Sequence, residues 1–480
     1  MKKYLKIILI MICILLFNTI VYANSAPTYW TDYPSTGIMA VDKNTPIEVL
    51  KENLLFDFTM DYENSYSPSA KVEAVYEMKN TSDEIISVKM AFPFIERFSE
   101  LSLDDIKITA DDEVIPYNVY LGDVVQESGY PFQEPKNTDY NIDNILQSIG
   151  KKKYLANNFK ENDLGKLYKF NVSSIDDNIN FALSFDFNSE KTKIILNGFN
   201  RFERDDDNNI RIASHIRKDE PLDEPLEIYV LGEDINFDIK GYTNGSLEEE
   251  TDKFEYEIII EDIDIDTYLK ELANYYLKEY DSNENVTNSH MSEVQLYNLY
   301  AESLDKYLDK NLGICTEEDI RSQTWSIRII TLVYTVEFPK NSNKEVSVSY
   351  KTNGTMDRRK TVEPQFTYEY ILNPARNWKD FNNLNIKIIT PKEAPYIINS
   401  SVELKKDDNN VYKAYLEELP EEDFFFTLYS KEKVTLSDRV KGYLNRTFGY
   451  FTSIAIGFIV ILIVIILNFM FVKYRRKKTN

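Results

Sequence analysis

Alternation of apolar and polar residues is the dominant pattern of this chain. Between residues 54 and 262, several short runs carry an apolar residue at every second position. This period of two is typical of β-strands with one buried face. Two such runs, 72–78 and 86–92, flank turn residues at 80–83 and predict a β-hairpin. We therefore expect residues 24–265 to form a β-rich region of one or more domains.

The period of the pattern changes at Asp266, which is a candidate N-cap. Apolar residues at helical spacing follow over 269–280. A second amphipathic stretch covers 297–308 and ends near Gly313. The segment 266–313 therefore predicts an α-helical hairpin inserted between two β regions, and its stripe of Tyr and Leu is typical of a packed face.

Period-two runs return after the helical segment. Seven short strands in about 105 residues is the count expected of an immunoglobulin-like sandwich, so the pattern predicts a C-terminal β-sandwich domain over 320–432. Residues 407–410 supply a polar turn, and 433–450 are interpreted as a stalk. The predicted strands are 325–338, 345–350, 365–372, 384–389, 401–405, 411–416 and 424–430.

The N-terminal residues have the form of a signal peptide. Three lysines among the first six residues precede an apolar run at 7–17 and the small-residue site that ends at Ala23. We expect cleavage after residue 23, with an uncleaved anchor as the alternative. Cys13 suggests a lipoprotein, but Ile12 stands where a small residue is needed before a lipidated cysteine.

The C-terminal residues predict one transmembrane helix. Residues 451–472 carry no charge and are about as long as a bilayer core requires, and 473–480 form a basic tail. By the positive-inside rule this tail is cytoplasmic. The sequence thus predicts a mainly β fold of β-sandwich domains with an inserted helical hairpin, anchored in the cell membrane by a single pass, with the ectodomain outside.

Charge and cysteine content restrict the function of the segment 24–450. It carries 47 Lys and Arg against 79 Asp and Glu, a formal charge of −32. Such a surface repels nucleic acid, which excludes it as a partner. Cys315 is the only cysteine in this segment, so no disulfide can form within it and packing must supply the stability.

The side chains that most often carry catalysis are scarce. His215 and His290 are the only histidines, and neither has a metal-binding spacing. Cys315 has no surrounding nucleophile motif, and we interpret it as packed at a helix end. Phosphate-binding and dinucleotide fingerprints are absent from the sequence. We therefore assign no catalytic, cofactor-binding or metal-binding residue and expect no cofactor.

Acidic clusters are the remaining candidates for a site. Residues 205–209 form the densest group of oxygen ligands that could bind calcium. They lack the alternation and the glycine of an EF-hand loop, so they are interpreted as a solvated hairpin tip. Asp262, Asp264 and Asp266 alternate and are expected on one water-facing side of a strand. A pair of carboxylates for glycoside hydrolysis stays open, because sequence alone cannot show their separation.

Several short motifs lie at residues 26–30, 33–37, 46–48, 91–94 and 370–378. They resemble those of uncharacterised membrane-anchored exported proteins of low-GC Gram-positive bacteria, a group with no assigned activity. The resemblance implies location only. Trp30 and Trp378 in these motifs are expected to be core anchors, with a contact role as the alternative.

The sequence therefore favours a cell-surface binding or scaffolding protein, because β-sandwich modules present loops to partners and no catalytic constellation is visible. The expected partners are the membrane and either an extracellular protein or a cell-wall polymer. Two other functions stay open: a cell-envelope hydrolase that uses a carboxylate pair, and an extracellular sensor that acts through a membrane partner.

Overall fold

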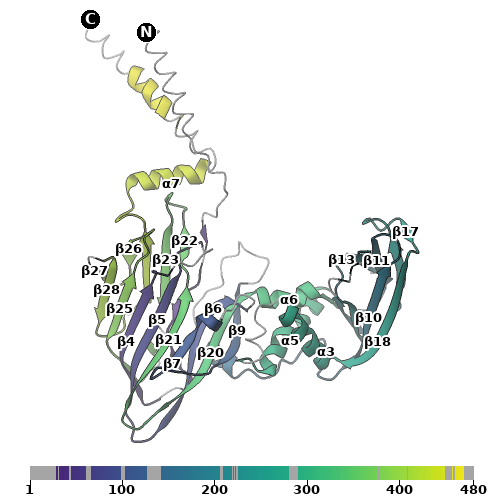
Figure 1. The fold of residues 1–480 in the computed structure, drawn as a ribbon, viewed down its shortest axis with the longest axis horizontal. Helices are drawn as coiled ribbons and strands as arrows, with labels where there is room; N and C mark the ends of the chain where they lie inside the picture. The colour runs from purple at the N-terminus through teal and green to yellow at the C-terminus, as the bar shows by residue number, and fades with distance from the viewer. Residues whose placement is uncertain are drawn as a thin grey trace. The chain divides into compact units, whose positions relative to one another are not determined.

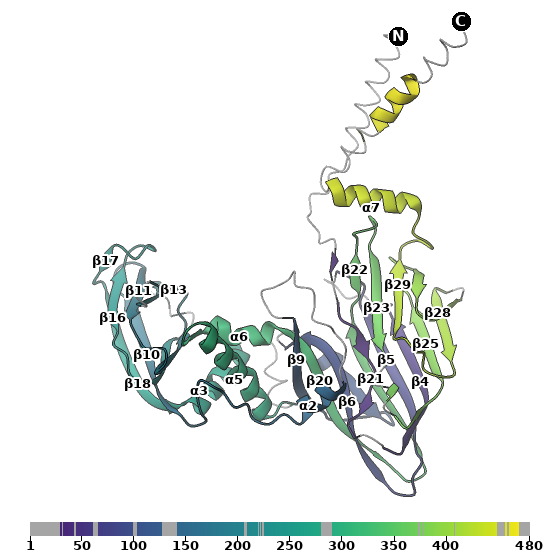
Figure 2. The same ribbon diagram turned by 180° about the vertical axis from the view of Figure 1, so that it is seen from behind.

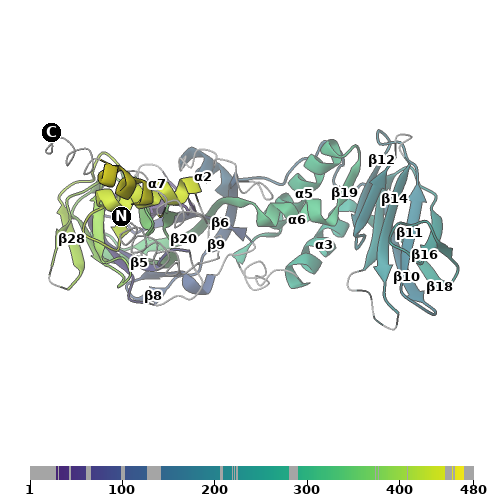
Figure 3. The same ribbon diagram turned by 90° about the horizontal axis from the view of Figure 1, so that it is seen from above.

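The fold is seen in a computed structural model (Figures 1, 2 and 3). The predicted signal peptide at 1–23 and the predicted tail at 473–480 lie outside the described residues. The structure describes residues 29–30, 32–42, 45–60, 66–98, 103–126, 142–205, 209–218, 220, 222, 225–279, 290–372, 375–376, 378–407, 409–448, 457 and 460–469.

The chain folds into two compact units. The terminal unit draws its described residues from 1–90, 104–115 and 336–480, and the inserted unit draws them from 91–103 and 116–335. The mainly β character expected from the alternation is confirmed. The boundaries of the two units nevertheless differ from those of the expected domains 24–265, 266–313 and 320–432. Strands from both ends of the chain share sheets in the terminal unit.

A mixed nine-stranded sheet forms one layer of the terminal unit. At its centre the long strand β4 pairs antiparallel with β5 and in parallel with β25, so strands distant in sequence become neighbours. In order across the sheet, the strands are β27 (Lys405–Lys406), β28 (Val411–Leu416), β25 (Leu384–Ile389), β4 (Ile47–Asp57), β5 (Ala70–Asn80), β21 (Asn343–Thr352), β7 (Lys107–Ala110) and β8 (Glu113–Val114), with β24 (Asp380–Phe381) beside β4.

A six-stranded sheet forms the second layer, and helix α7 (Leu436–Phe448) follows its last strand in sequence. Rings from the two layers meet between them: Phe56 of β4 lies 5.1 Å from Phe426 of β29 and 6.2 Å from Tyr370 of β23, measured between ring centroids. The two sheets therefore pack face to face around an aromatic core. The strands in order are β1 (Tyr29–Trp30), β22 (Thr355–Asp357), β23 (Gln365–Ile371), β29 (Phe424–Tyr429) and β26 (Tyr396–Ser400), with β2 (Ser35–Thr36) parallel to β23.

The hairpin predicted over 72–92 is not formed. Both strands exist, as β5 and β6 (Ile86–Arg97), but β5 pairs with β4 and β21. β6 joins another sheet, in the order β3 (Met39–Ala40), β6, β20 (Ile327–Phe338) and β9 (Asn118–Gln126). Both edges of β5 are occupied by partners from elsewhere in the chain, so β6 has no edge of β5 left to join.

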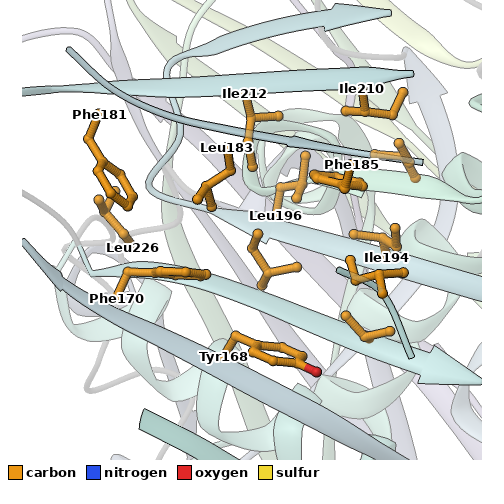
Figure 4. Packing of buried hydrophobic residues seen from close by; sticks show 14 of the residues in the cluster. Tyr168, Phe170, Phe181, Leu183, Phe185, Ile194, Leu196, Ile210, Ile212 and Leu226 are labelled. Atoms are coloured by element: carbon orange, nitrogen blue, oxygen red, sulfur yellow. The ribbon is translucent and has the colours of Figure 1, made fainter. Parts of the chain in front are cut away.

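The inserted unit contains a second sandwich, made of two five-stranded sheets. Apolar side chains from both sheets, among them Phe170 and Ile228 from one and Phe181 and Ile212 from the other, form its core (Figure 4). One sheet has the order β18 (Phe254–Asp264), β10 (Leu164–Ser174), β15 (Leu226–Gly232), β12 (Thr192–Asn197) and β19 (Ile314–Thr316). The other has the order β13 (Arg201–Arg204), β14 (Ile210–Ile216), β11 (Ile179–Phe185), β16 (Asp238–Tyr242) and β17 (Glu250–Thr251).

Helices lie where the period of the sequence changes. The expected helical segment contains α3 and α5, and Tyr268 of α3 stacks on Tyr229 of β15 with ring centroids 4.3 Å apart. The N-cap is Asp264, two residues before the expected Asp266, because the backbone N–H of Thr267 donates to the side chain of Asp264 at 2.9 Å. The helical elements that precede α7 among the described residues are η2 (Leu103–Asp105), α2 (Ile142–Ile149), α3 (Ile265–Glu279), α5 (Glu293–Lys310) and α6 (Glu317–Trp325).

The predicted transmembrane helix is corrected by the structure. Within the described residues, no helix is both long enough and apolar enough to cross a membrane. Of the range 451–472, the structure describes residue 457 and the helical stretch 460–469. The transmembrane helix, and the single-pass cell-membrane localisation that depended on it, are therefore withdrawn.

Candidate functional site

The rare reactive side chains are placed apart from one another. His215 is an exposed residue of β14, whereas His290 stacks on Tyr117 and its Nδ1 lies 3.0 Å from the backbone oxygen of that tyrosine. Cys315 is buried in β19, between helices α5 and α6 in sequence. No hydrogen bond joins any two of these three described residues, so the structure does not assemble them into a nucleophile–base pair.

Cys315 of the native protein is expected to resist alkylation by a maleimide. Its side chain is completely buried, and burial raises the pKa of the thiol well above its usual value, so little thiolate is exposed to react. The measurement is the rate of labelling at Cys315, read by peptide mass spectrometry in native buffer and in denaturant. A Glu190→Cys variant, at an exposed turn, is the matched positive control. Equal labelling rates at the two positions under native conditions would contradict the buried placement.

The acidic groups singled out by the sequence have structural roles. Asp205 and Asn209 close the turn between the paired strands β13 and β14, as expected of a hairpin tip; residues 206–208 lie outside the described residues. Asp264 caps helix α3, and Asp266 forms an ion pair with Lys153, so the three alternating aspartates do not share one strand face. Within the described part of the chain, no group of three His, Cys, Asp or Glu residues could hold a metal ion.

The two tryptophans of the sequence motifs have different environments. Trp378 is buried, and its indole N–H donates to the backbone oxygen of Ile38 at 3.3 Å, which confirms the expected core anchor. Trp30 is 43% exposed on β1 and stacks on Tyr66, with ring centroids 4.3 Å apart. The core interpretation is therefore wrong for Trp30.

A buried glutamate that sequence reasoning missed lies between the two sheets of the terminal unit. The register of β4 slips at Leu50, which has no partner on β5. Before the bulge, the buried residues of β4 are Ile47 and Val49, at odd positions. After it, they are Glu52, Leu54 and Phe56, at even positions. One signal in the sequence could have indicated this burial: Glu52 continues the alternation of the apolar residues Leu54 and Phe56.

Two tyrosines hold the Glu52 carboxyl group. Tyr370 of β23 donates its hydroxyl to Oε1 of Glu52 at 2.9 Å, and the hydroxyls of Tyr370 and Tyr76 lie 3.0 Å apart. Gly37 packs against this group: a Cβ there would stand 2.7 Å from the Tyr76 hydroxyl and 3.0 Å from the Tyr370 hydroxyl. The cluster therefore links both sheets and the strand segment 35–40 by hydrogen bonds and close packing.

The electrostatics of Glu52 favour its neutral form. Burial raises the pKa of its carboxyl group to about 7, against the smaller lowering by hydrogen bonds from the two tyrosines. Its second oxygen, Oε2, is buried and makes no hydrogen bond to a described residue. The groups that act on Glu52 through hydrogen bonds are the phenol hydroxyls of Tyr370 and Tyr76.

A buried aspartate in the inserted unit has the opposite character. Asp305 of α5 accepts hydrogen bonds from the hydroxyl of Tyr154 and from the backbone N–H groups of Asn157 and Asn158, at 2.8 to 2.9 Å. The backbone donors lower the pKa of Asp305 despite the opposing effect of burial. Asp305 thus stays ionised and fastens the segment 154–158 to α5, a structural role.

A candidate binding feature is the outer edge of β18 in the inserted unit. β18 pairs with β10 over eleven residues without a bulge and is the last strand of its sheet. Tyr256, Ile259 and Ile260 on this strand are 40 to 56% exposed. Among the described residues no strand pairs with its other edge, so a row of main-chain N–H and C=O groups faces outward there.

Comparison with known proteins adds little to this geometry. No family model matches the chain, and no curated protein matches it. Among solved structures, the chain is similar to one from Legionella pneumophila described as a "putative nutrient binding protein", with 9% identity over 88% of this chain and 76% of that chain. The TM-score is 0.30, and a likeness at that level carries no argument about fold or function.

Proposed function

We propose that this protein acts by binding and not by turnover, and that it takes up an extended segment of a protein partner by strand addition to β18. The observation that carries the proposal is the outer edge of this eleven-residue strand, with which no described strand pairs. An exposed edge of that length is a template for main-chain pairing with another chain. Strand addition supplies affinity through main-chain hydrogen bonds and specificity through alternate side chains.

The side chains at this edge favour an added strand. Phe254 and Tyr256 lie 5.9 and 6.2 Å from Phe181, measured between ring centroids, so the exposed row of β18 continues the sandwich core. Ile260 of the same row is 56% exposed. A strand placed beside β18 would cover these side chains and remove apolar surface from water. This geometry favours a polypeptide partner over a cell-wall polymer, because peptide groups pair with every main-chain group along an edge.

Hydrogen exchange on the full chain tests strand addition. The probes are three blocked nonapeptides in which Val alternates with Lys, with Thr or with Glu, called here the Lys, Thr and Glu peptides. At least one is expected to bind and to slow the exchange of amides within 254–264. The matched control is the same peptide with N-methyl groups on alternate backbone nitrogens of its pairing edge, which keeps the side chains but removes the hydrogen bonds.

The N-methylated copy is expected not to bind. Binding of the copy with the affinity of its parent would show that main-chain pairing is not involved. Absence of binding by all three peptides, or protection confined to residues outside 254–264, would reject strand addition at β18.

A further inference from the structure

We infer that the segment accepted by β18 alternates apolar residues with basic ones; this inference rests on the strand addition proposed above. The two rows of side chains on β18 differ in character. Phe254, Tyr256, Ile258 and Ile260 form one row, which faces the sandwich core. Glu255, Glu257, Ile259 and Glu261 form the other row on the opposite face, and β18 contains no Lys or Arg. The edge is thus apolar on one face and acidic on the other.

The acidic row is only partly neutralised by its neighbours. Lys169 of β10 forms an ion pair with Glu261, with Nζ 2.8 Å from the carboxylate oxygen. In the part of the chain that the structure describes, Glu255 and Glu257 form no ion pair, and Glu257 has only a hydrogen bond from Asn171 at 3.5 Å. The negative charge of this face is therefore available to a partner.

Two further carboxylates extend the same face. Glu227 of β15 is the cross-strand neighbour of Lys169. Glu271 of α3 is close enough to act electrostatically on both Glu227 and Lys169. One lysine therefore stands among several carboxylates beside the β18 edge. Cross-strand pairs of opposite charge stabilise a sheet and like charges oppose each other, so residues placed opposite the acidic row are favoured when they are basic.

The same pattern disfavours a second copy of this chain as the occupant. If two β18 strands paired antiparallel around a two-fold axis, residue i would face a residue of the same parity. The glutamates at 255, 257 and 261 would then face one another, which is destabilising. The charges that would attract a basic segment thus also protect this long edge from self-association.

Comparison of the three peptides on the full chain tests the charge preference. The Lys peptide is expected to bind about tenfold or more tightly than the Thr peptide, because two or three new cross-strand ion pairs each contribute modestly. The Glu peptide is expected not to bind. Raising the salt concentration is expected to weaken binding of the Lys peptide and to leave the affinity of the Thr peptide nearly unchanged.

Charge reversal locates the preference. The variant that combines Glu255→Lys and Glu257→Lys, both at exposed positions, is expected to lose the preference for the Lys peptide and to bind the Glu peptide instead. Glu190→Lys, in an exposed turn of the same unit, is the control. It is expected to bind the Lys peptide more tightly than the Thr peptide, as the parent protein does.

The outcomes separate the two proposals. Equal affinity for the Thr and Lys peptides, with protection of 254–264, would overturn the charge inference while strand addition stands. Failure of all three peptides would overturn strand addition itself. A concentration-dependent dimer that protects 254–264 without added peptide would instead identify a second copy as the occupant.

Discussion

Replacement of Glu52 by Gln is expected to stabilise the terminal unit above neutral pH, by about 3 kcal/mol at pH 8, and to change its stability little at pH 4.5. Burial raises the pKa of the Glu52 carboxyl group to about 7 in the folded state, whereas an exposed glutamate titrates at 4.5. The folded state therefore holds its proton more strongly than the unfolded state does. Its contribution to stability is present below pH 4.5 and is lost as the pH rises to 7.

The measurement is the difference in free energy of unfolding between the Glu52→Gln variant and the parent protein at several pH values from 4.5 to 8. Taking the difference removes the contributions of other titrating groups, provided that they are independent of Glu52. Hydrogen exchange of the β4 amides assigns the effect to the terminal unit. Glu73→Gln, on the neighbouring strand β5, is the matched control for replacing a carboxyl group by an amide. A difference for Glu52→Gln that does not change with pH would contradict the neutral buried carboxyl group.

Replacement of Asp305 by Ala is expected to destabilise the inserted unit by about 3 kcal/mol. Two backbone N–H groups and one hydroxyl lose a charged acceptor, and a buried donor left without its partner costs about 1–3 kcal/mol. Because the pKa of Asp305 is lowered in the folded state, its contribution is present above the unfolded value near 3.9 and is lost as the pH falls through the folded value.

Denaturant unfolding at neutral pH measures this loss, with hydrogen exchange at Asn157 and Asn158 as the local readout. Asp305→Asn is expected to give an intermediate loss, because its amide keeps one acceptor oxygen. Asp309→Ala is the control on the same helix: Asp309 is exposed and accepts one hydrogen bond from the side chain of Asn158, so its loss is expected to be small. Equal effects of Asp305→Ala and Asp309→Ala would show that the buried hydrogen bonds contribute little.

Glu52 and Asp305 show how the surroundings decide the charge of a buried carboxyl group. Asp305 meets two backbone N–H donors and a hydroxyl, which stabilise its anion. Glu52 accepts a hydrogen bond from the hydroxyl of Tyr370, and its other oxygen accepts none from a described residue, so desolvation dominates. Nothing in the local sequence distinguishes the two residues in this respect, since the donors come from other elements.

The local pattern of apolar and polar residues predicted many of the strands and helices of this protein. The period of two located long strands such as β5, β6 and β20, and the change to helical spacing located α3 and α5. Elements of this kind follow from which side chains share a face, and that information lies within a few consecutive residues. The sequence also predicted the turn at 205–209 and the absence of a disulfide within 24–450, since one cysteine cannot pair with itself.

Only the tertiary structure decided which strands became neighbours. The predicted hairpin failed because β5 found its partners in β4 and β21, the latter more than 260 residues away in sequence. The bulge at Leu50 turned Glu52 inward, and the position of β18 at the end of its sheet left its outer edge without a partner among the described strands. Strand pairing, register and edges depend on contacts between distant segments. A single sequence does not show such contacts, and so neither the buried glutamate nor the outer edge of β18 was found from it.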